Sequence, residues 1–319
     1  MSPPGRPKGE FRSAQHGGCL MSLRVAFIGC VESSAVALQA LLNLAPGSVD
    51  VVGLITRRSS TFNADFHDLS PLAKRLGIPV LYAEDAPDDS AQAEWLLATA
   101  PDLVFCVGWS RLLGPKLLQA APRGVIGYHP AALPANRGRH PLIWALALGL
   151  EETASSFFFM QPQADSGPIL DQQRIPISGD DDAASLYAKI LAAIGSQVGT
   201  IVDGLTTGRL RPQAQDETQA SHWRKRSVAD GQIDWRMGAQ SVHNLVRALS
   251  LPYPGAHIVL GGVPAKVWKC AVASAGTPNQ EPGKVLAVSG REVTVKCGVG
   301  AIRLIEHDLL TLPAPGDYL

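Results

Sequence analysis

The sequence has no excess of charge of either sign, because 28 Lys and Arg residues balance 28 Asp and Glu residues in a chain of 319. A neutral chain has no overall field that attracts nucleic acid or an anionic membrane, so any polyanion site must be local. Apolar runs of roughly 18 residues, the length of a membrane span, are missing. The opening segment MSPPGRPKGEFRSAQHGGCL lacks the apolar stretch of a signal peptide. We therefore expect a cytoplasmic protein with no membrane partner.

The chain also lacks paired or clustered cysteines. None of the five forms a CxxC motif: Cys19, Cys30, Cys106, Cys270 and Cys297. No two His or Cys residues have the spacing of a metal site, so we expect no bound metal. Cys30 and Cys106 fall in apolar runs, which favours buried thiols in a reducing compartment.

The chain does have enough apolar sequence for a sizeable core, with 46% hydrophobic and 18% charged residues. This length and composition predict two domains. Residues 1–20 are polar and rich in Gly, Pro and Arg, so we expect a disordered leader before a second methionine, Met21. We expect an α/β domain over residues 21–211, a linker over 212–240, and a helix with a small β-barrel over 241–319.

Apolar strand-like runs alternate with helical patterns about six times in the first domain. The run LRVAFIG is followed by the helical pattern SSAVALQALLNLA, for which Ser33 or Ser34 is the expected N-cap. This alternation predicts a doubly wound, mostly parallel, Rossmann-like sheet. Ligands bind beyond the carboxyl ends of the strands of such sheets. Trp109 and His129, each at the end of an apolar run, are therefore expected at the same rim.

The pattern changes after residue 211. A polar stretch precedes the helical pattern AQSVHNLVRALS and five short strand patterns, AHIVL, AKVWKC, KVLAVS, EVTVKC and AIRLIE, which predict a small OB-like barrel. The basic run His222–Arg226 is most simply a solvated face of the linker, with a contact to phosphate or RNA as the alternative. No polar residues of this domain have a site-like arrangement, so we expect it to contribute little to chemistry.

His129 and Asp165 are the strongest candidates for chemistry. His129 precedes Pro130, which cannot continue a ladder of backbone hydrogen bonds, and a loop with arginines follows. This position favours a catalytic role over a structural one. Asp165 follows the apolar run SSFFFM and is expected at the same rim, where it would fix the tautomer of the imidazole. The alternative for Asp165 is a turn-forming Asp-Ser-Gly.

The neighbouring residues supply further candidates. Arg137 and Arg139 flank Gly138, which suits an anion clamp, with a solvated loop as the alternative. Trp109 offers a flat surface for a planar ring, or simply caps the core. Gly127 shares a strand face with His129, so we expect open space beside it for a water or a ligand group, with a bulge as the alternative.

Three segments of the first domain, DLVFCVGWSRLL, GVIGYHPAALPANRGRHPLIWALALG and ADSGPIL, carry a family resemblance. DGQIDWRMGAQSVHNLVRALSLPYPGAHIVL and GKVLAVSGREVTVKCGVGAIRL carry it in the second domain. Together and in this order they resemble the formyltetrahydrofolate-dependent formyltransferases, the family of methionyl-tRNA formyltransferase and the sugar-nucleotide N-formyltransferases. The resemblance covers nearly the whole chain from Met21.

The resemblance implies a catalytic set of Asn-x-His and a later Asp, which His129 and Asp165 match, while Gly127 stands at the position of the Asn. The residues implied to hold the pterin are mostly in the loop after one strand: Trp109, Ser110, Arg111, Leu112 and Asp165. The residues implied to contact the acceptor flank the histidine or follow it: Tyr128, Pro130, Arg137, Gly138 and Arg139.

The reaction implied by the resemblance is transfer of a formyl group from N10-formyltetrahydrofolate to a primary amine. A nucleotide-linked amino sugar is the favoured acceptor, and Ser59–Lys74 is a further candidate for contacting it. One alternative is methionyl-tRNA formyl transfer, in which the basic run would contact tRNA. Others are a formyltetrahydrofolate hydrolase and a folate-binding protein whose catalysis is weakened by Gly127. The sequence leaves a homodimer open.

Overall fold

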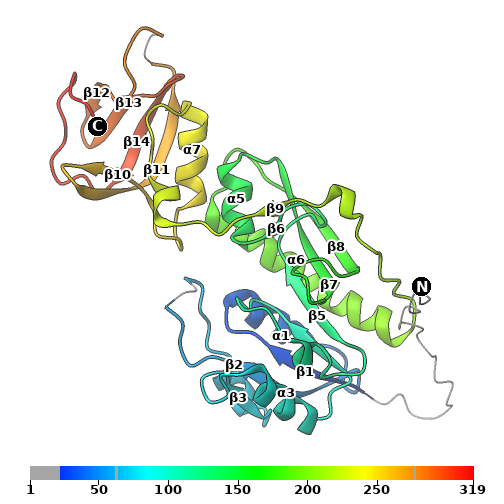
Figure 1. The fold of residues 1–319 in the computed structure, drawn as a ribbon. Helices are drawn as coiled ribbons and strands as arrows, with labels where there is room; N and C mark the ends of the chain where they lie inside the picture. Colours follow the sequence, from blue (N-terminus) through cyan, green and yellow to red (C-terminus); the bar gives the residue numbers. More distant parts are fainter. Residues whose placement is uncertain (1–21, 62–63, 276–277) are drawn as a thin grey trace, which may run out of the picture.

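A computed structural model describes residues 22–61, 64–275 and 278–319, so the expected leader lies outside the described residues. Figure 1 shows an elongated molecule with an α/β domain from about the first two thirds of the chain and a smaller β-rich domain at the C-terminal end. Helix α5 (Pro141–Ala147) of the first domain lies beside α7 (Ala239–Ala248) of the second. The two domains therefore meet through a pair of helices.

The N-terminal domain is built on a seven-stranded sheet. In spatial order its strands are β3 (Val80–Tyr82), β2 (Val49–Thr56), β1 (Leu23–Ile28), β4 (Leu103–Cys106), β5 (Val125–His129), β7 (Glu152–Phe159) and β8 (Ile169–Pro176). Strands β3, β2, β1, β4 and β5 run parallel, while β7 is antiparallel to β5 and β8 is antiparallel to β7. The predicted mostly parallel α/β sheet is confirmed.

Helices cover both faces of this sheet. Besides α5 they are α1 (Glu32–Leu42), α2 (Ser70–Arg75), α3 (Asp89–Ala98), α4 (Pro115–Leu118) and α6 (Ala183–Thr206). Phe27 and Phe105 pack with α1, α2, α5 and α6 on one face. Ile28 and Val104 pack with α3 and α4 on the other face. Alternate residues of each central strand thus pack into two cores, one on each face of the sheet, which is the doubly wound arrangement.

Helix α6 is the one helix in the described ranges whose length and hydropathy would allow it to cross a membrane. Its apolar side chains pack against α1, β7 and β8 inside the domain. Asp182 caps its first turn by accepting a hydrogen bond of 2.9 Å from the backbone N–H of Ser185. We therefore describe α6 as a core helix.

The C-terminal domain carries a five-stranded antiparallel sheet against which α7 packs. Its spatial order is β10 (Ala256–Leu260), β11 (Val263–Ala273), β14 (Ala301–His307), β13 (Glu292–Lys296) and β12 (Val285–Ser289). All five expected strands are therefore present. Closure of these strands into an OB-like barrel stays a prediction.

Residues 213–231, which we call the strap, were expected to be a linker but run back along the N-terminal domain. They contain two short 3-10 turns, η1 (Glu217–Gln219) and η2 (Val228–Gly231), and strand β9 (His222–Trp223). Strand β9 pairs in parallel with β6 (Arg137–Gly138), in the loop that follows His129 (Figure 1). The strap is thus part of the N-terminal domain's packing.

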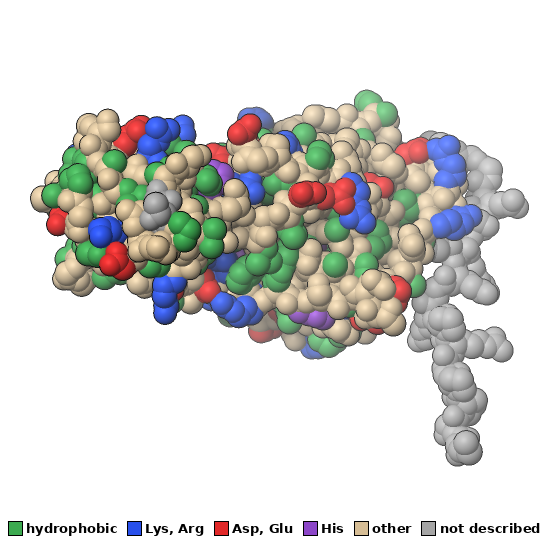
Figure 2. Space-filling view, turned by 90° about the horizontal axis from the view of Figure 1, so that it is seen from above, with side chains coloured by type: hydrophobic (Ala, Val, Ile, Leu, Met, Phe, Trp, Pro, Cys, Tyr) green, Lys and Arg blue, Asp and Glu red, His purple; other side chains and the backbone are tan. Residues whose placement is uncertain are grey.

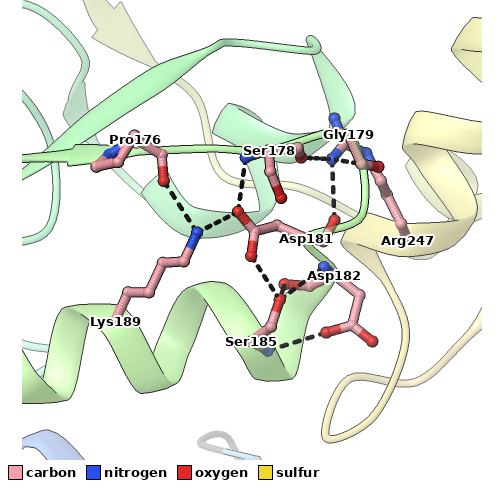
Figure 3. A network of polar contacts seen from close by, with 8 residues as sticks. All are labelled: Pro176, Ser178, Gly179, Asp181, Asp182, Ser185, Lys189 and Arg247. Atoms are coloured by element: carbon pink, nitrogen blue, oxygen red, sulfur yellow. Dashed lines mark hydrogen bonds and ion pairs between the residues drawn. The ribbon is translucent and has the colours of Figure 1, made fainter.

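A polar network fixes the junction between the domains (Figure 3). Arg247 of α7 donates hydrogen bonds of 2.9 Å to the carbonyl oxygens of Ser178 and Asp181, in the loop before α6. The carboxylate of Asp181 accepts from Lys189 at 2.5 Å and from Ser185 at 2.9 Å. These contacts bind the second domain to the start of the core helix of the first.

On the face shown in Figure 2, Lys and Arg side chains are interspersed with Asp and Glu side chains over both domains. This mixture agrees with the equal numbers of acidic and basic residues in the chain. A broad electrostatic footprint for nucleic acid would instead gather basic residues on one face.

Candidate active site

His129 is the last residue of β5, and only 5% of its surface is exposed. Its Nε2 atom lies 2.8 Å from the carbonyl oxygen of Asn136. A carbonyl can only accept a hydrogen bond, so the hydrogen of the neutral ring lies on Nε2 and the lone pair on Nδ1. The loop backbone therefore fixes the tautomer, a role that we expected of Asp165.

Asp165 lies beside the other ring nitrogen, with its Oδ2 atom 3.8 Å from Nδ1 of His129. The same oxygen accepts a hydrogen bond of 2.9 Å from the backbone N–H of Gly138. A separation of 3.8 Å is too long for a hydrogen bond but places the carboxylate where it would stabilise a proton on Nδ1. The structure thus brings together the two residues predicted for chemistry.

Asp165 reaches His129 by a route that the sequence did not indicate. Strand β7 is antiparallel to β5, so Phe159 at its end pairs with Ile126, and His129 pairs with Ser156. The loop of residues 160–168 brings Asp165 back to the histidine. Asp165 itself has φ +55°, a left-handed conformation that is costly for a residue other than glycine and persists only where surrounding contacts hold it.

Gln215 of the strap supplies those contacts, and the sequence analysis missed it. Its Nε2 atom donates to the carbonyl oxygens of Asp165 at 2.8 Å and Gly167 at 2.7 Å. Its Oε1 atom accepts from Nη2 of Arg137 at 2.7 Å. One amide side chain therefore ties the loop that carries Asp165 to the loop that follows His129.

Arg137 does not line the cavity, although we expected it to contact substrate. Its side chain is fully buried, and its Nη1 and Nη2 atoms donate to the carboxylate of Glu217 at 2.9 and 2.7 Å. This contact also lowers the pKa of Glu217. Arg137 is thus paired with the strap rather than presented to a ligand.

Gly138 sits where the strap and the carboxylate of Asp165 meet. Its φ is +106°, and a Cβ added there would lie 2.3 Å from the carbonyl oxygen of Trp223. The N–H groups of Arg137 and Arg139 donate to the strap, at Ser221 and Trp223, while that of Gly138 donates to Asp165. A glycine is required here because the strap backbone crosses so closely.

A cavity of about 530 Å³ opens beside this pair. Seven of the predicted residues line it: Trp109, Ser110, Tyr128, His129, Pro130, Gly138 and Arg139. The lining residues do not include Gly127, Arg111, Leu112, Arg137 or Asp165, and Leu112 is 67% exposed. The guanidinium of Arg139 donates 2.8 Å to the carbonyl oxygen of Ser110, so the Arg139 loop contacts the loop after β4.

The space expected beside Gly127 is filled. A Cβ added there would lie 2.6 Å from Cγ of Met160 and 3.0 Å from Cζ of Phe158. Met160 belongs to the loop that brings Asp165 back to the histidine. The expectation of room for a water or a ligand group at Gly127 is therefore wrong, because an apolar side chain occupies the position.

The C-terminal domain helps to line the cavity, although we expected none of its polar residues to have a site-like arrangement. That this domain contributes little to chemistry stays a prediction. Tyr253, His257 and Lys266 of that domain line the cavity together with Arg226 at the end of the basic run. Arg226 lies with its guanidinium 4.5 Å from the centre of the Trp144 ring. The basic run is therefore only in part a solvated face.

A half-buried tyrosine and an aspartate line another part of the cavity. The hydroxyl of Tyr187 donates to Oδ2 of Asp65 at 2.7 Å and accepts from the backbone N–H of Ser33 at 3.1 Å. Burial raises the pKa of Tyr187, and the charge of Asp65 raises it further. Asp65 belongs to Ser59–Lys74, so the described part of that segment does reach the cavity.

Within residues 22–61, 64–275 and 278–319, no group of three or more His, Cys, Asp or Glu side chains is placed to hold a metal ion.

Solved structures with a similar fold include WlaRD, a sugar 3N-formyl transferase solved with dTDP and 5-N-formyl-THF, at 16% identity and a TM-score of 0.66, over 91% of this chain and 99% of that one. Another is an N-formyltransferase from Helicobacter canadensis in complex with folinic acid and dTDP-3-aminofucose, at 16% identity and a TM-score of 0.68, over 88% and 98% of the two chains. HypX from Aquifex aeolicus, in complex with tetrahydrofolic acid, matches at 18% identity and a TM-score of 0.62, over 88% of this chain. The present chain spans only 43% of that HypX chain.

Sequence identities this low establish the shared fold alone. Family models reach further, because a model described as formyl transferase matches residues 23–198, more than half of the chain. A second model, described as the formyl transferase C-terminal domain, matches residues 225–311. The two matches cover both domains that build the cavity, and the chain belongs to the formyl transferase family.

Proposed function

We propose that this protein transfers a formyl group from N10-formyltetrahydrofolate to the primary amine of a nucleotide-linked amino sugar. The observation that carries the proposal is the pair formed by His129, at the end of β5, and Asp165, in the loop after β7, with His129 lining a cavity of about 530 Å³. Cavities of a few hundred Å³ hold ligands of this size. The folate and dTDP-sugar ligands of the similar structures support the choice of both substrates.

In the proposed reaction, the amine attacks the formyl carbon, and His129 accepts the proton that the amine loses. The bond from the formyl carbon to N10 then breaks, and the proton passes to N10 of tetrahydrofolate. The Nε2–H of His129 is committed to the carbonyl oxygen of Asn136, so Nδ1 is the basic atom. Asp165 lies 3.8 Å from Nδ1 and would stabilise the imidazolium that forms. Apo contacts of this kind commonly shorten when substrate binds.

Gly127 stands at the position where the resemblance implies an Asn, so the proposal includes a slow turnover. Met160 fills that position, so no amide side chain stabilises the oxyanion from there. The loss of one oxyanion donor typically costs about 2.7–4 kcal/mol, or roughly 10²–10³ in kcat. We therefore expect an active transferase with a modest turnover number.

The test is to incubate the protein with N10-formyltetrahydrofolate and a panel of dTDP-, UDP- and GDP-linked amino sugars, following the mass of each sugar. We expect one member of the panel to gain a formyl group. Release of tetrahydrofolate without a formylated sugar would indicate a hydrolase. Transfer to methionyl-tRNA with a strong salt dependence would indicate the tRNA enzyme.

A further inference from the structure

The cavity has a strong local charge although the chain as a whole is neutral. Three basic side chains line it: Arg139, Arg226 and Lys266. Asp65 is the one carboxylate side chain among the described residues that line it. A low-dielectric cleft of one sign of charge concentrates ligands of the opposite sign. The cavity therefore favours an anionic ligand.

The cations fall into two groups on different parts of the wall. Arg139 is tied to the carbonyl oxygen of Ser110, on the side of the cavity formed by the loop after β4. Lys266 and His257 occupy paired positions on β11 and β10, so they lie side by side on the C-terminal domain. Arg226 belongs to the strap, at the end of the basic run. This second group therefore comes from the strap and from the C-terminal domain.

No carboxylate of the described residues forms an ion pair with Arg226 or Lys266 of the second group, although Asp230 lies near Arg226. The carboxylate of Asp230 accepts hydrogen bonds from Arg224 and Ser227, and the guanidinium of Arg226 donates to the backbone carbonyl oxygen of Asp230, at 2.6 Å. Lys266 makes a contact of 3.4 Å with the carbonyl oxygen of Gly255. Burial and the charge of Lys266 lower the pKa of His257, as expected beside a cation without an anion.

We propose that Arg226, Lys266 and His257 form an oxyanion subsite that binds the phosphate groups of the acceptor while its amine reaches His129. The inference rests on the proposed function, because the acceptor's diphosphate is what supplies the charge. The guanidinium of Arg226, the ammonium of Lys266 and the imidazole of His257 can each donate hydrogen bonds to phosphate oxygens. Specificity for a phosphorylated acceptor would thus come from the junction of the two domains.

The test is a binding titration at constant ionic strength with inorganic pyrophosphate and with dTDP, in the absence of folate. The variants are Lys266→Gln and Arg226→Gln. The matched control is Lys269→Gln, on the same strand but exposed and close to Glu306. We expect each of the two variants to weaken dTDP binding by roughly 10-fold to 100-fold, the loss typical of one charged hydrogen bond. The control should stay within about twofold, because exposed pairs contribute little.

Steady-state kinetics then separate the two sources of an oxyanion. A rise of KM for the amino sugar in Lys266→Gln supports the subsite. A rise confined to KM for N10-formyltetrahydrofolate would instead show that the folate carboxylates bind there, and it would overturn the assignment. Equal effects of Lys266→Gln and Lys269→Gln on dTDP binding would also overturn it. If dTDP binding depends on Lys266 but no amino sugar is formylated, the subsite stands and the proposed function fails. Circular dichroism of each variant checks that the fold is intact.

Discussion

At the scale of single residues, the imidazole of His129 is oriented by a backbone carbonyl, and the carboxylate of Asp165 is held by a backbone N–H. Neither anchor is a side chain that a sequence motif would reveal. The types of the two residues and their place after apolar runs were enough to predict that they meet. The atoms that hold them depend on the path of the loop, which residue types do not encode.

Removing either member of this pair should abolish most of the activity. We expect His129→Ala and Asp165→Asn each to lower kcat for formyl transfer by at least about 10², the usual contribution of a positioned acid–base group. His307→Ala, in β14 and not among the residues lining the cavity, serves as the control. Rates near that of the wild type in either variant would remove the pair from the mechanism.

Gly127→Asn should not restore an amide donor by itself. The added Cβ would lie 2.6 Å from Met160, and overpacking of this kind typically costs about 1–3 kcal/mol. We expect a lower Tm for Gly127→Asn and a partial recovery of Tm when it is combined with Met160→Ala. The combined variant should also have a higher kcat than Met160→Ala alone. An unchanged Tm in Gly127→Asn would show that the position has room after all.

At the scale of elements, the alternation of apolar runs was sufficient to predict the parallel strands, the antiparallel C-terminal strands and α7. It missed β8, because half of its residues are polar, and a strand at the edge of a sheet needs only one apolar face. It also misplaced the start of α1, which begins at Glu32. Ser34, one of the two expected caps, instead accepts hydrogen bonds from the N–H groups of Cys30 and Val31 within that turn.

The strap was unpredictable for a related reason. Its sequence is polar, and a polar stretch is typical of a solvated linker. Its fixed position comes from the buried guanidinium of Arg137 and from Gln215, which make hydrogen bonds to each other and to distant loops. Such long-range polar contacts have no local signature in a single sequence.

Gln215 should act as a positioning residue for Asp165. Gln215→Glu replaces the donor that faces two carbonyl oxygens with an acceptor, so the Asp165 loop should shift. We expect kcat to fall by roughly 10-fold to 100-fold, the effect of a misplaced catalytic group, and the pH profile of kcat to change. Gln219→Glu, exposed in the same strap, is the control. A lower Tm with an unchanged pH profile would mean that Gln215 is only structural.

At the scale of the whole molecule, the cavity is lined by both domains and by the strap. The network of Arg247 and Asp181 fixes their junction (Figure 3). Three histidines in this part of the molecule, His140, His243 and His257, have a pKa below the usual value of 6.5, chiefly because burial disfavours their charged form.

Stability should therefore fall as the pH is lowered from 7 to 5. The unfolded chain binds protons at these histidines near pH 6.5 while the folded chain does not, so protonation favours unfolding across this window. The hydrogen-bonded carboxyls of Asp181 and Asp234 have a pKa of about 2 and lose their stabilising effect only at lower pH. Urea unfolding at pH 7, 6 and 5 checks this, and a free energy of unfolding that is constant or rises towards pH 5 would contradict it.

The central claim is that the site around His129 and Asp165 couples release of the formyl group from the folate to its transfer to an amine. The most direct measurement is the ratio of tetrahydrofolate released to formylated amino sugar formed, in one assay, for the wild type and for His129→Ala. The account predicts a ratio close to one for the wild type, and the loss of both products in the variant. Release of tetrahydrofolate well in excess of formylated sugar, or formylation that persists in His129→Ala, would contradict it.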